Sequence, residues 1–104
     1  MYTINPTATA NQEFNTFIGG VEYGFRLHLF RGMLYADVSV DGTVIARSVR
    51  CIDREWLFPV HPKGMAGNFR FESDRSGVYP DYEKFGDSCR IVFYTNEEIA
   101  ALDE

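Results

Sequence analysis

Residues 21–43 read VEYGFRLHLFRGMLYADVSVDGT, and apolar and polar side chains alternate on both sides of Arg31-Gly32. A period of two is typical of strands that bury one face. If Arg31-Gly32 forms a tight turn, the resulting antiparallel hairpin has apolar pairs on one face, namely Leu29 with Leu34, Leu27 with Ala36, Phe25 with Val38 and Tyr23 with Val40. The opposite face pairs Arg26 with Asp37 and His28 with Tyr35. A slip of one residue would mix the two faces, so the pattern specifies the register.

A second turn follows this hairpin. Asp41-Gly42 is typical of a type I′ turn, which returns the chain through Thr43–Ile45 as the third strand of a meander. The alternation then fails, because Arg47 interrupts the apolar phase. We therefore expect a bulge, a sharp bend or the mouth of a barrel near Ala46-Arg47.

Further strands are predicted downstream of the meander. Phe69 and Phe71 alternate with polar residues, and Cys89–Tyr94 has the composition of a last strand. Thr95 and Glu98 have the spacing of a capping box, which begins a short helix. The expected fold is all-β: a small barrel or sandwich of about six or seven antiparallel strands that opens with the three-stranded meander and ends in a short helical turn.

The polar, aperiodic residues at the beginning of the chain suggest a division into segments. We expect a flexible arm over residues 1–12, a single β domain over residues 13–96 and an acidic tail over residues 97–104. Cys51 and Cys89 lie far apart and form no metal-binding motif, so we expect two buried thiols.

Length and charge narrow the functional classes. The 104 residues make one domain with a net charge of −5. Four of these charges come from Glu97, Glu98, Asp103 and Glu104, which leaves residues 1–96 with a net charge of −1. A nearly neutral body is poorly suited to bind nucleic-acid phosphates. The sequence has neither a signal peptide nor an apolar run of the roughly 20 residues that cross a membrane, so we expect synthesis in a cytosol and no membrane partner.

No catalytic or metal-binding motif is present, so we expect no enzyme activity, no cofactor and no metal site. His28 lies in the alternating pattern and His61 lies between two prolines, where a surface or loop role is the simpler interpretation. A hydrolase that uses Asp53 or Glu55 is the least favoured hypothesis, because nothing in their spacing requires two acids to converge.

Aromatic residues carry the strongest functional signal. Six Tyr, nine Phe and one Trp are more than a core of this size readily buries. We predict a protein-contact surface formed by the hairpin tip and the later aromatic loop, and its residues are Phe30, Met33, Tyr35, Tyr79, Tyr82 and Phe85. Two alternatives remain open. A second layer of the domain covers these rings, or the rings stack single-stranded nucleic acid or an oligosaccharide on an OB-like sheet.

The stretch Gly24–Thr43 resembles the opening meander of the baseplate plug family of contractile-tailed phages. The similarity continues, in the same order and spacing, through Gly64–Glu72, Tyr79–Gly86 and Cys89–Tyr94. The family often has a tryptophan in the second strand of the meander, where this chain has Leu34-Tyr35.

The resemblance implies a small, β-rich structural protein at the centre of a phage baseplate, where tail tube, hub and spike meet. The family has no catalytic residues to transfer to this chain. The implied partners are hub, tail tube or spike proteins and further copies of the chain itself. The implied location is the virion, after assembly in the cytoplasm of a bacterial host.

Overall fold

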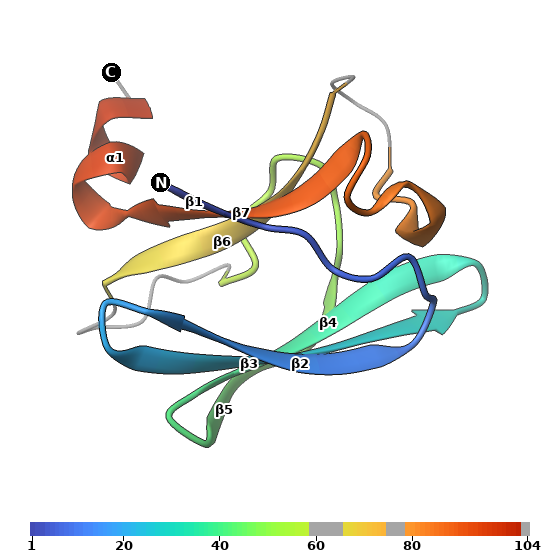
Figure 1. Ribbon diagram of the computed structural model, residues 1–104, viewed down its shortest axis with the longest axis horizontal. Coiled ribbons are helices and arrows are strands. Elements are labelled where there is room, and N and C mark those ends of the chain that lie inside the picture. The colour runs from blue at the N-terminus through green and yellow to red at the C-terminus, as the bar shows by residue number, and fades with distance from the viewer. Residues whose placement is uncertain (59–65, 75–78, 103–104) are drawn as a thin grey trace.

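Two antiparallel sheets that pack face to face contain the strands of the protein (Figure 1). The computed structural model describes residues 1–58, 66–74 and 79–102. The elements in chain order are β1 (Tyr2–Ile4), β2 (Gln12–Ile18), β3 (Val21–Phe30), β4 (Met33–Val40), β5 (Thr43–Arg50), β6 (Gly67–Ser73), the 3₁₀ turn η1 (Tyr82–Lys84), β7 (Cys89–Thr95) and α1 (Asn96–Leu102). One sheet has the strand order β2-β3-β4-β5 and the other has the order β1-β7-β6.

The central hairpin forms in the predicted register. β3 and β4 pair without a break from Phe30 opposite Met33 to Tyr23 opposite Val40. At the turn, Arg31 has φ 51° and the following glycine has φ 76°. Positive φ at both central residues defines a type I′ turn, whose twist matches that of the flanking strands. The turn from β4 into β5 has the same conformation, so the predicted meander is confirmed.

The irregularity expected near Ala46-Arg47 is also present. The register between β4 and β5 shifts twice, on either side of the pair formed by Val38 and Ala46. Ser48 has φ 49°, and its backbone N–H donates to the Asp37 carboxylate at 2.6 Å. A bulge of this kind bends the strand and increases its twist. The bulges therefore distort the outer edge of this sheet at β5.

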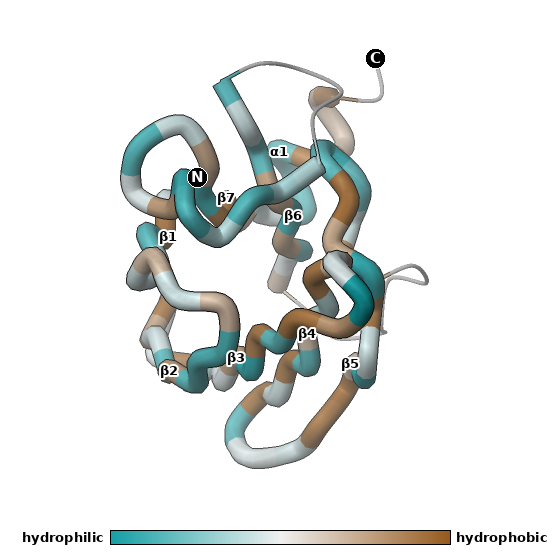
Figure 2. The backbone as a smooth tube through the Cα atoms, turned by 90° about the vertical axis from the view of Figure 1, so that its right-hand side faces the viewer, coloured by the Kyte–Doolittle hydropathy of each residue, from teal (hydrophilic) through white to brown (hydrophobic). Residues whose placement is uncertain are grey.

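The sheets form a sandwich and not a closed barrel. Within the described residues, no pairing joins β1 to β2 or β5 to β6. Figure 2, turned by 90°, shows β2, β3, β4 and β5 in one layer and β1, β7 and β6 in the other. Of the two architectures that the sequence left open, the sandwich is confirmed, and the protein does not have the closed barrel of an OB-like fold.

Two strands were not expected from the sequence. β2 adds a fourth strand to the meander, with Phe14 and Ile18 turned inward and Phe17 outward. β1 lies in the segment that the sequence analysis left as an arm, and it pairs Tyr2 with Phe93 and Ile4 with Ile91 of β7. The beginning of the chain thus completes an edge of the second sheet.

The core between the sheets is mostly aromatic. Phe69 of β6 is fully buried, and its ring centroid lies 4.9 Å from those of Phe25 and Phe93 and 5.0 Å from that of Tyr23. Offset and edge-to-face ring pairs at such distances add about 0.5–1.5 kcal/mol each beyond the area that they bury. One β6 side chain therefore connects β3 to β7 across the interface of the two sheets.

The segment after β5 crosses to the free edge of β6. The Asp53 carboxylate accepts a hydrogen bond from the Ser73 N–H at 2.8 Å and contacts Arg54 at 2.6 Å. Farther along, Leu57 N–H donates to the Phe69 carbonyl at 2.8 Å. The buried Asn68 side chain both donates to and accepts from the backbone of Phe58 at 3.1 Å. This edge of the sheet is therefore covered. His61, which the sequence placed in a loop, lies outside the described residues.

The capping box at the end of the chain is confirmed. Glu98 N–H donates to the Thr95 hydroxyl at 3.2 Å, and Thr95 N–H donates to the Glu98 carboxylate at 3.0 Å. The same carboxylate lies 2.9 Å from the N-terminal ammonium group of Met1. A helix of seven residues is marginal alone. Its cap and the ion pair therefore fasten α1 to the β1-β7-β6 sheet.

This arrangement predicts a pH dependence of α1. The pKa of Glu98 lies below its usual range, because the carboxylate accepts the Thr95 N–H and contacts the N-terminal ammonium group. A group with a lowered native pKa stabilises the folded state above its unfolded pKa, and this contribution is lost as the pH falls through the native value. We expect the amides of α1 to lose protection from hydrogen exchange below about pH 4, before those of the strands. Glu98→Gln keeps the capping geometry without the charge, so the protection of the α1 amides in this variant should no longer depend on pH in this range. An unchanged loss of protection in Glu98→Gln would contradict the assignment of the pH dependence to Glu98.

Candidate interaction surface

Exposed apolar side chains gather at one end of the sandwich. Tyr79 is 64% exposed and Phe30 is 57% exposed, and Met33 on the other side of the hairpin turn is also exposed. The β3–β4 turn and the segment before η1 lie at the same end of the molecule, on the right in Figure 1. The structure therefore brings together two of the groups that the sequence assigned to a contact surface.

A hollow of about 210 Å³ lies between these two segments, and we name it the tip hollow. Its lining combines the hairpin turn, the end of β5 and the residues before η1, and consists of Arg31, Gly32, Met33, Leu34, Arg50, Cys51, Tyr79 and Pro80. The Cys51 N–H donates to the Leu34 carbonyl at 2.9 Å. Both of these side chains are buried, so the floor of the tip hollow is part of the folded core.

Two arginine side chains give the tip hollow a positive charge. The Arg50 guanidinium carbon lies 5.0 Å from the centroid of the Tyr79 ring, and that of Arg31 lies 5.3 Å from the Phe30 ring. Neither guanidinium has a carboxylate within ion-pair distance in the described part of the chain. Cation–π contacts at exposed sites contribute about 0.5–1 kcal/mol and keep charge and ring together. The surface suits an apolar side chain flanked by carboxylates.

Sequence reasoning did not identify these arginines as site residues. Arg31 was assigned to a turn, and Arg50 belonged to a run of mixed charges before Glu55. The register set by the Asp41-Gly42 turn alone would pair Tyr35 with Ser48, and the two register shifts between β4 and β5 place Arg50 there instead. The approach of Tyr79 to Arg50 depends on tertiary packing, which the sequence pattern does not encode.

Tyr35 continues this surface onto the outer face of the β2-β3-β4-β5 sheet. Its ring stacks on His28, with centroids 5.8 Å apart and an interplanar angle of 16°. The pairing of these two residues across the hairpin is the one that the alternation predicts. Nδ1 of His28 is buried and has no hydrogen-bond partner in residues 1–58, 66–74 and 79–102. The half-buried Tyr35 therefore lies next to the tip hollow, with Arg50 on its other side.

Of the remaining two predicted surface residues, one is buried in the fold and the other is partly buried. Phe85 is only 6% exposed and stacks on Phe71 of β6, with ring centroids 5.9 Å apart. Tyr82 is half-buried and packs against the same core. The structure thus separates the set into an exposed part at the tip hollow and a part that anchors η1 to the second sheet. For Phe85 and Tyr82, the alternative in which the domain covers its own rings describes the structure.

This difference in burial predicts that two aromatic truncations change the free energy of unfolding by very different amounts. Phe85→Ala removes a buried ring and should lower the free energy of unfolding by about 3 kcal/mol. Tyr79→Ala removes an exposed ring and should change it by no more than about 0.5 kcal/mol. Urea unfolding followed by tryptophan fluorescence measures both values. Equal losses in the two variants would show that Tyr79 belongs to the core.

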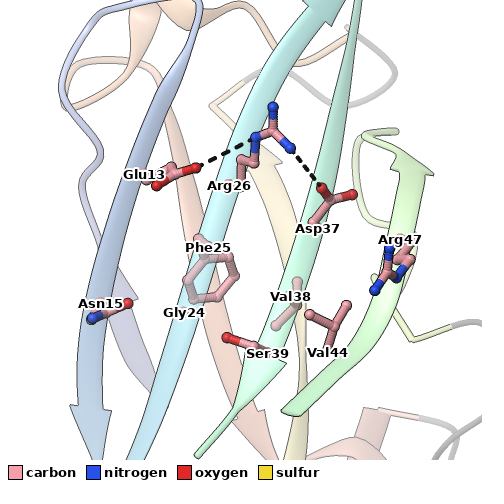
Figure 3. Close-up of a pocket in the computed structure, with 10 residues that line it drawn as sticks. All are labelled: Glu13, Asn15, Gly24, Phe25, Arg26, Asp37, Val38, Ser39, Val44 and Arg47. Carbon is pink, nitrogen blue, oxygen red and sulfur yellow. Dashed lines mark ion pairs between the residues drawn. The ribbon is translucent and has the colours of Figure 1, made fainter. Parts of the chain in front are cut away.

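A second hollow, of about 310 Å³, lies on the outer face of the β2-β3-β4-β5 sheet (Figure 3). Arg26 lies between two acids, with Nε 3.5 Å from the Glu13 carboxylate and Nη1 3.9 Å from that of Asp37. The predicted pair of Arg26 and Asp37 is therefore confirmed. The hollow exists because Gly24 has no side chain, and a Cβ there would overlap the Ser39 hydroxyl. Its central arginine is already paired, and exposed pairs of this kind contribute little energy.

Of the candidate catalytic groups, Asp53 is engaged in structural contacts and the two thiols are buried. The Asp53 carboxylate is occupied by the Ser73 N–H and by Arg54, whereas Glu55 is exposed. Cys51 and Cys89 are both buried free thiols, as expected. Burial raises the pKa of both thiols, so the uncharged thiol is favoured over the reactive thiolate at each position.

No cluster of three or more His, Cys, Asp or Glu side chains in the described ranges could hold a metal ion. None of the helices described is long and apolar enough to span a membrane.

Comparison with known proteins identifies one family. A family model described as the cyanophage baseplate Pam3 plug gp18 matches residues 1–97. No curated protein matches the chain. The matched residues include every strand in the described part of the chain and the whole lining of the tip hollow, and they end within α1.

Proposed function

This chain belongs to the cyanophage baseplate plug family, and from that premise we propose that it is a structural protein of a phage tail baseplate that acts through protein–protein contacts and without catalysis. Its place is the virion, and it is made in the cytoplasm of a bacterial host. Its neighbours are hub, tail tube or spike proteins and further copies of the same chain. The family match supports the baseplate role, and the tip hollow supports the mode of contact.

The observation that carries this proposal is the composition of the tip hollow. Aromatic, methionine and arginine side chains are enriched in protein interfaces, and a few of them supply most of the binding energy. Met33 and Tyr79 line the hollow and are exposed above a floor formed by the core, and the exposed Phe30 directly precedes the lining residue Arg31. An exposed apolar group on a preformed surface binds a protein partner without the cost of ordering a loop.

Separate observations support the part of the proposal that says the chain acts without catalysis. Asp53 holds the segment after β5 to β6, His28 stacks on Tyr35, and the Cys51 thiol is buried in the core. These contacts give each group a structural role. Binding of single-stranded nucleic acid has less support, because the whole chain carries a net charge of −5, residues 1–96 carry −1, and only two arginines line the tip hollow.

The proposal is tested by mixing the purified chain with the tail hub protein of the same phage and measuring the mass of the complex. We expect a complex with the unmodified chain, and at least tenfold weaker binding with the double variant Phe30→Ala/Tyr79→Ala. The matched control, Phe17→Ala/Val44→Ala, removes two exposed apolar side chains from the outer sheet face and should bind normally. Equal binding by the two variants would reject the tip hollow as the contact surface. Failure of the unmodified chain to bind hub, tube or spike proteins would reject the function.

A further inference from the structure

β2 is the outer strand of the sandwich that is open to pairing with a further strand. The free edge of β6 is covered, since the N–H groups of Arg54 and Leu57 donate to its carbonyls. β5 is distorted by two register shifts, and β1 has only three residues. β2 has seven residues and pairs with β3 without a break, and no strand of the described residues lies on its other side. A regular, uncovered edge of this kind readily pairs with another chain.

The backbone groups that face this free edge belong to Glu13, Asn15 and Phe17. Asp41 N–H donates to the Glu22 carbonyl at 2.8 Å, so the backbone of Glu22 faces β4. Glu22 lies opposite Phe17 in the pair of β3 and β2. Hydrogen-bonded and non-hydrogen-bonded pairs alternate along antiparallel strands, so Phe17 and every second residue before it point their N–H and C=O groups away from β3.

The side chains of β2 do not protect this edge. The strand contains neither proline nor lysine, which commonly prevent pairing at an edge. Its one charged residue is Glu13, whose carboxylate lies 3.5 Å from Nε of Arg26 on β3 (Figure 3). This charge is therefore directed across the sheet. On the inner face, the Phe14 ring stacks on Phe25 with centroids 5.2 Å apart, yet Phe14 is only half-buried.

We infer that two copies of the free chain form an antiparallel dimer through β2, with a two-fold axis between their Asn15 residues. Asn15 then lies opposite Asn15, and Glu13 lies opposite Phe17 of the second copy. The contact is isologous, and the four strands of each copy join into one continuous sheet. The inference goes beyond the proposed function and concerns the chain before it enters a tail. No residue of β2 lines the tip hollow.

A second copy is the occupant because β2 is complementary to itself. In this register each of the three edge residues meets an edge residue of the second copy, so all of them exchange both backbone hydrogen bonds. A shift of two residues leaves one edge residue of each copy unpaired. The two Glu13 carboxylates lie at opposite ends of the contact and do not face each other. On the inner face, the half-buried Phe14 lies opposite Thr16 of the second copy, and pairs of an aromatic and a β-branched residue stabilise sheets.

Sedimentation velocity of the purified full chain over a range of concentrations tests this contact. We expect the unmodified chain to form a dimer and Asn15→Pro to associate at least tenfold more weakly. Proline removes an N–H that faces the free edge and no hydrogen bond to β3, and edge strands tolerate it. Far-UV circular dichroism checks that Asn15→Pro keeps the fold.

A second pair of variants tests the register without changing the backbone. Asn15→Lys and Asn15→Glu each place like charges opposite each other at the two-fold axis, so each alone should associate about fivefold more weakly. Their equimolar mixture should associate again, because opposite charges then face each other. The matched control, Val44→Lys, adds the same charge at an exposed position of β5 and should dimerise like the unmodified chain.

Three results would overturn the inference. They are an unmodified chain that stays a monomer, an Asn15→Pro variant that folds and still dimerises, and a mixture of the two charge variants that associates no better than either alone. The experiment contains no other baseplate protein. A chain that stays monomeric yet binds the hub would therefore reject the β2 dimer and retain the proposed function.

Discussion

Phe69→Ala is expected to lower the free energy of unfolding by about 4 kcal/mol, within the range for truncation of a fully buried phenylalanine. The ring lies within 5.0 Å of three other aromatic centroids, from both sheets, and is 0% exposed. Its removal leaves a cavity that β3 and β7 cannot both close, because each is fixed by the pairing within its own sheet. The two layers of the sandwich thus lose their main shared contact.

Chemical denaturation with urea measures this loss. The matched control is Phe17→Ala, which removes the same ring from a side chain that is 70% exposed on β2. We expect the control to change stability by no more than about 0.5 kcal/mol. Equal effects of the two substitutions would mean that Phe69 is not at the centre of the core.

Gly67→Ala is expected to cost about 3 kcal/mol, at the upper end of the range for overpacking. A Cβ at this position would overlap the Tyr94 carbonyl oxygen and lie 2.7 Å from Cζ of Phe93. The carbonyl belongs to the backbone of β7, the strand paired with β6, so relief requires the two strands to separate. The Phe93 ring cannot move away freely, because it packs against Phe69 and Tyr23.

The control for this substitution separates steric overlap from backbone strain. Gly19 has φ 60° and nothing within 4 Å of the position of a Cβ, so Gly19→Ala tests the left-handed conformation alone. This conformation costs a residue with a Cβ about 1–2 kcal/mol. Thermal unfolding should therefore show that Gly67→Ala loses more stability than Gly19→Ala. If Gly67→Ala loses less stability than Gly19→Ala, the close approach of β6 and β7 is contradicted.

The parts of the fold that the sequence predicts are those with local signals. The β3–β4 hairpin has apolar residues on one face in only one register, and each of the two turns of the meander has a glycine at a positive φ. The helix begins with a capping box at Thr95 that acts over three residues. β1 and β2 were missed for a physical reason. β1 has only three residues, and the outward-facing Phe17 of β2 obscures the alternation of its neighbours.

The sequence predicted the residues of the tip hollow only in part, because tertiary contacts form the hollow. Phe30 and Met33 are exposed by the hairpin tip itself, which the sequence indicates. No sequence pattern indicates that Tyr79 lies over Arg50, or that Phe85 stacks on Phe71 in the core. Aromatic residues in one loop therefore divide between surface and core according to how η1 packs on the second sheet.

The central claim is that this chain is a baseplate protein whose tip hollow contacts a neighbouring subunit. The most direct measurement places a photo-crosslinking amino acid at position 79 of the chain in assembled phage particles, with position 17 as the control. We expect purified tails to contain the chain. We expect position 79 to crosslink to another baseplate subunit, which includes a second copy of the chain, and position 17 to give few crosslinks. Tails that lack the chain, or crosslinks from position 17 and none from position 79, would contradict this account.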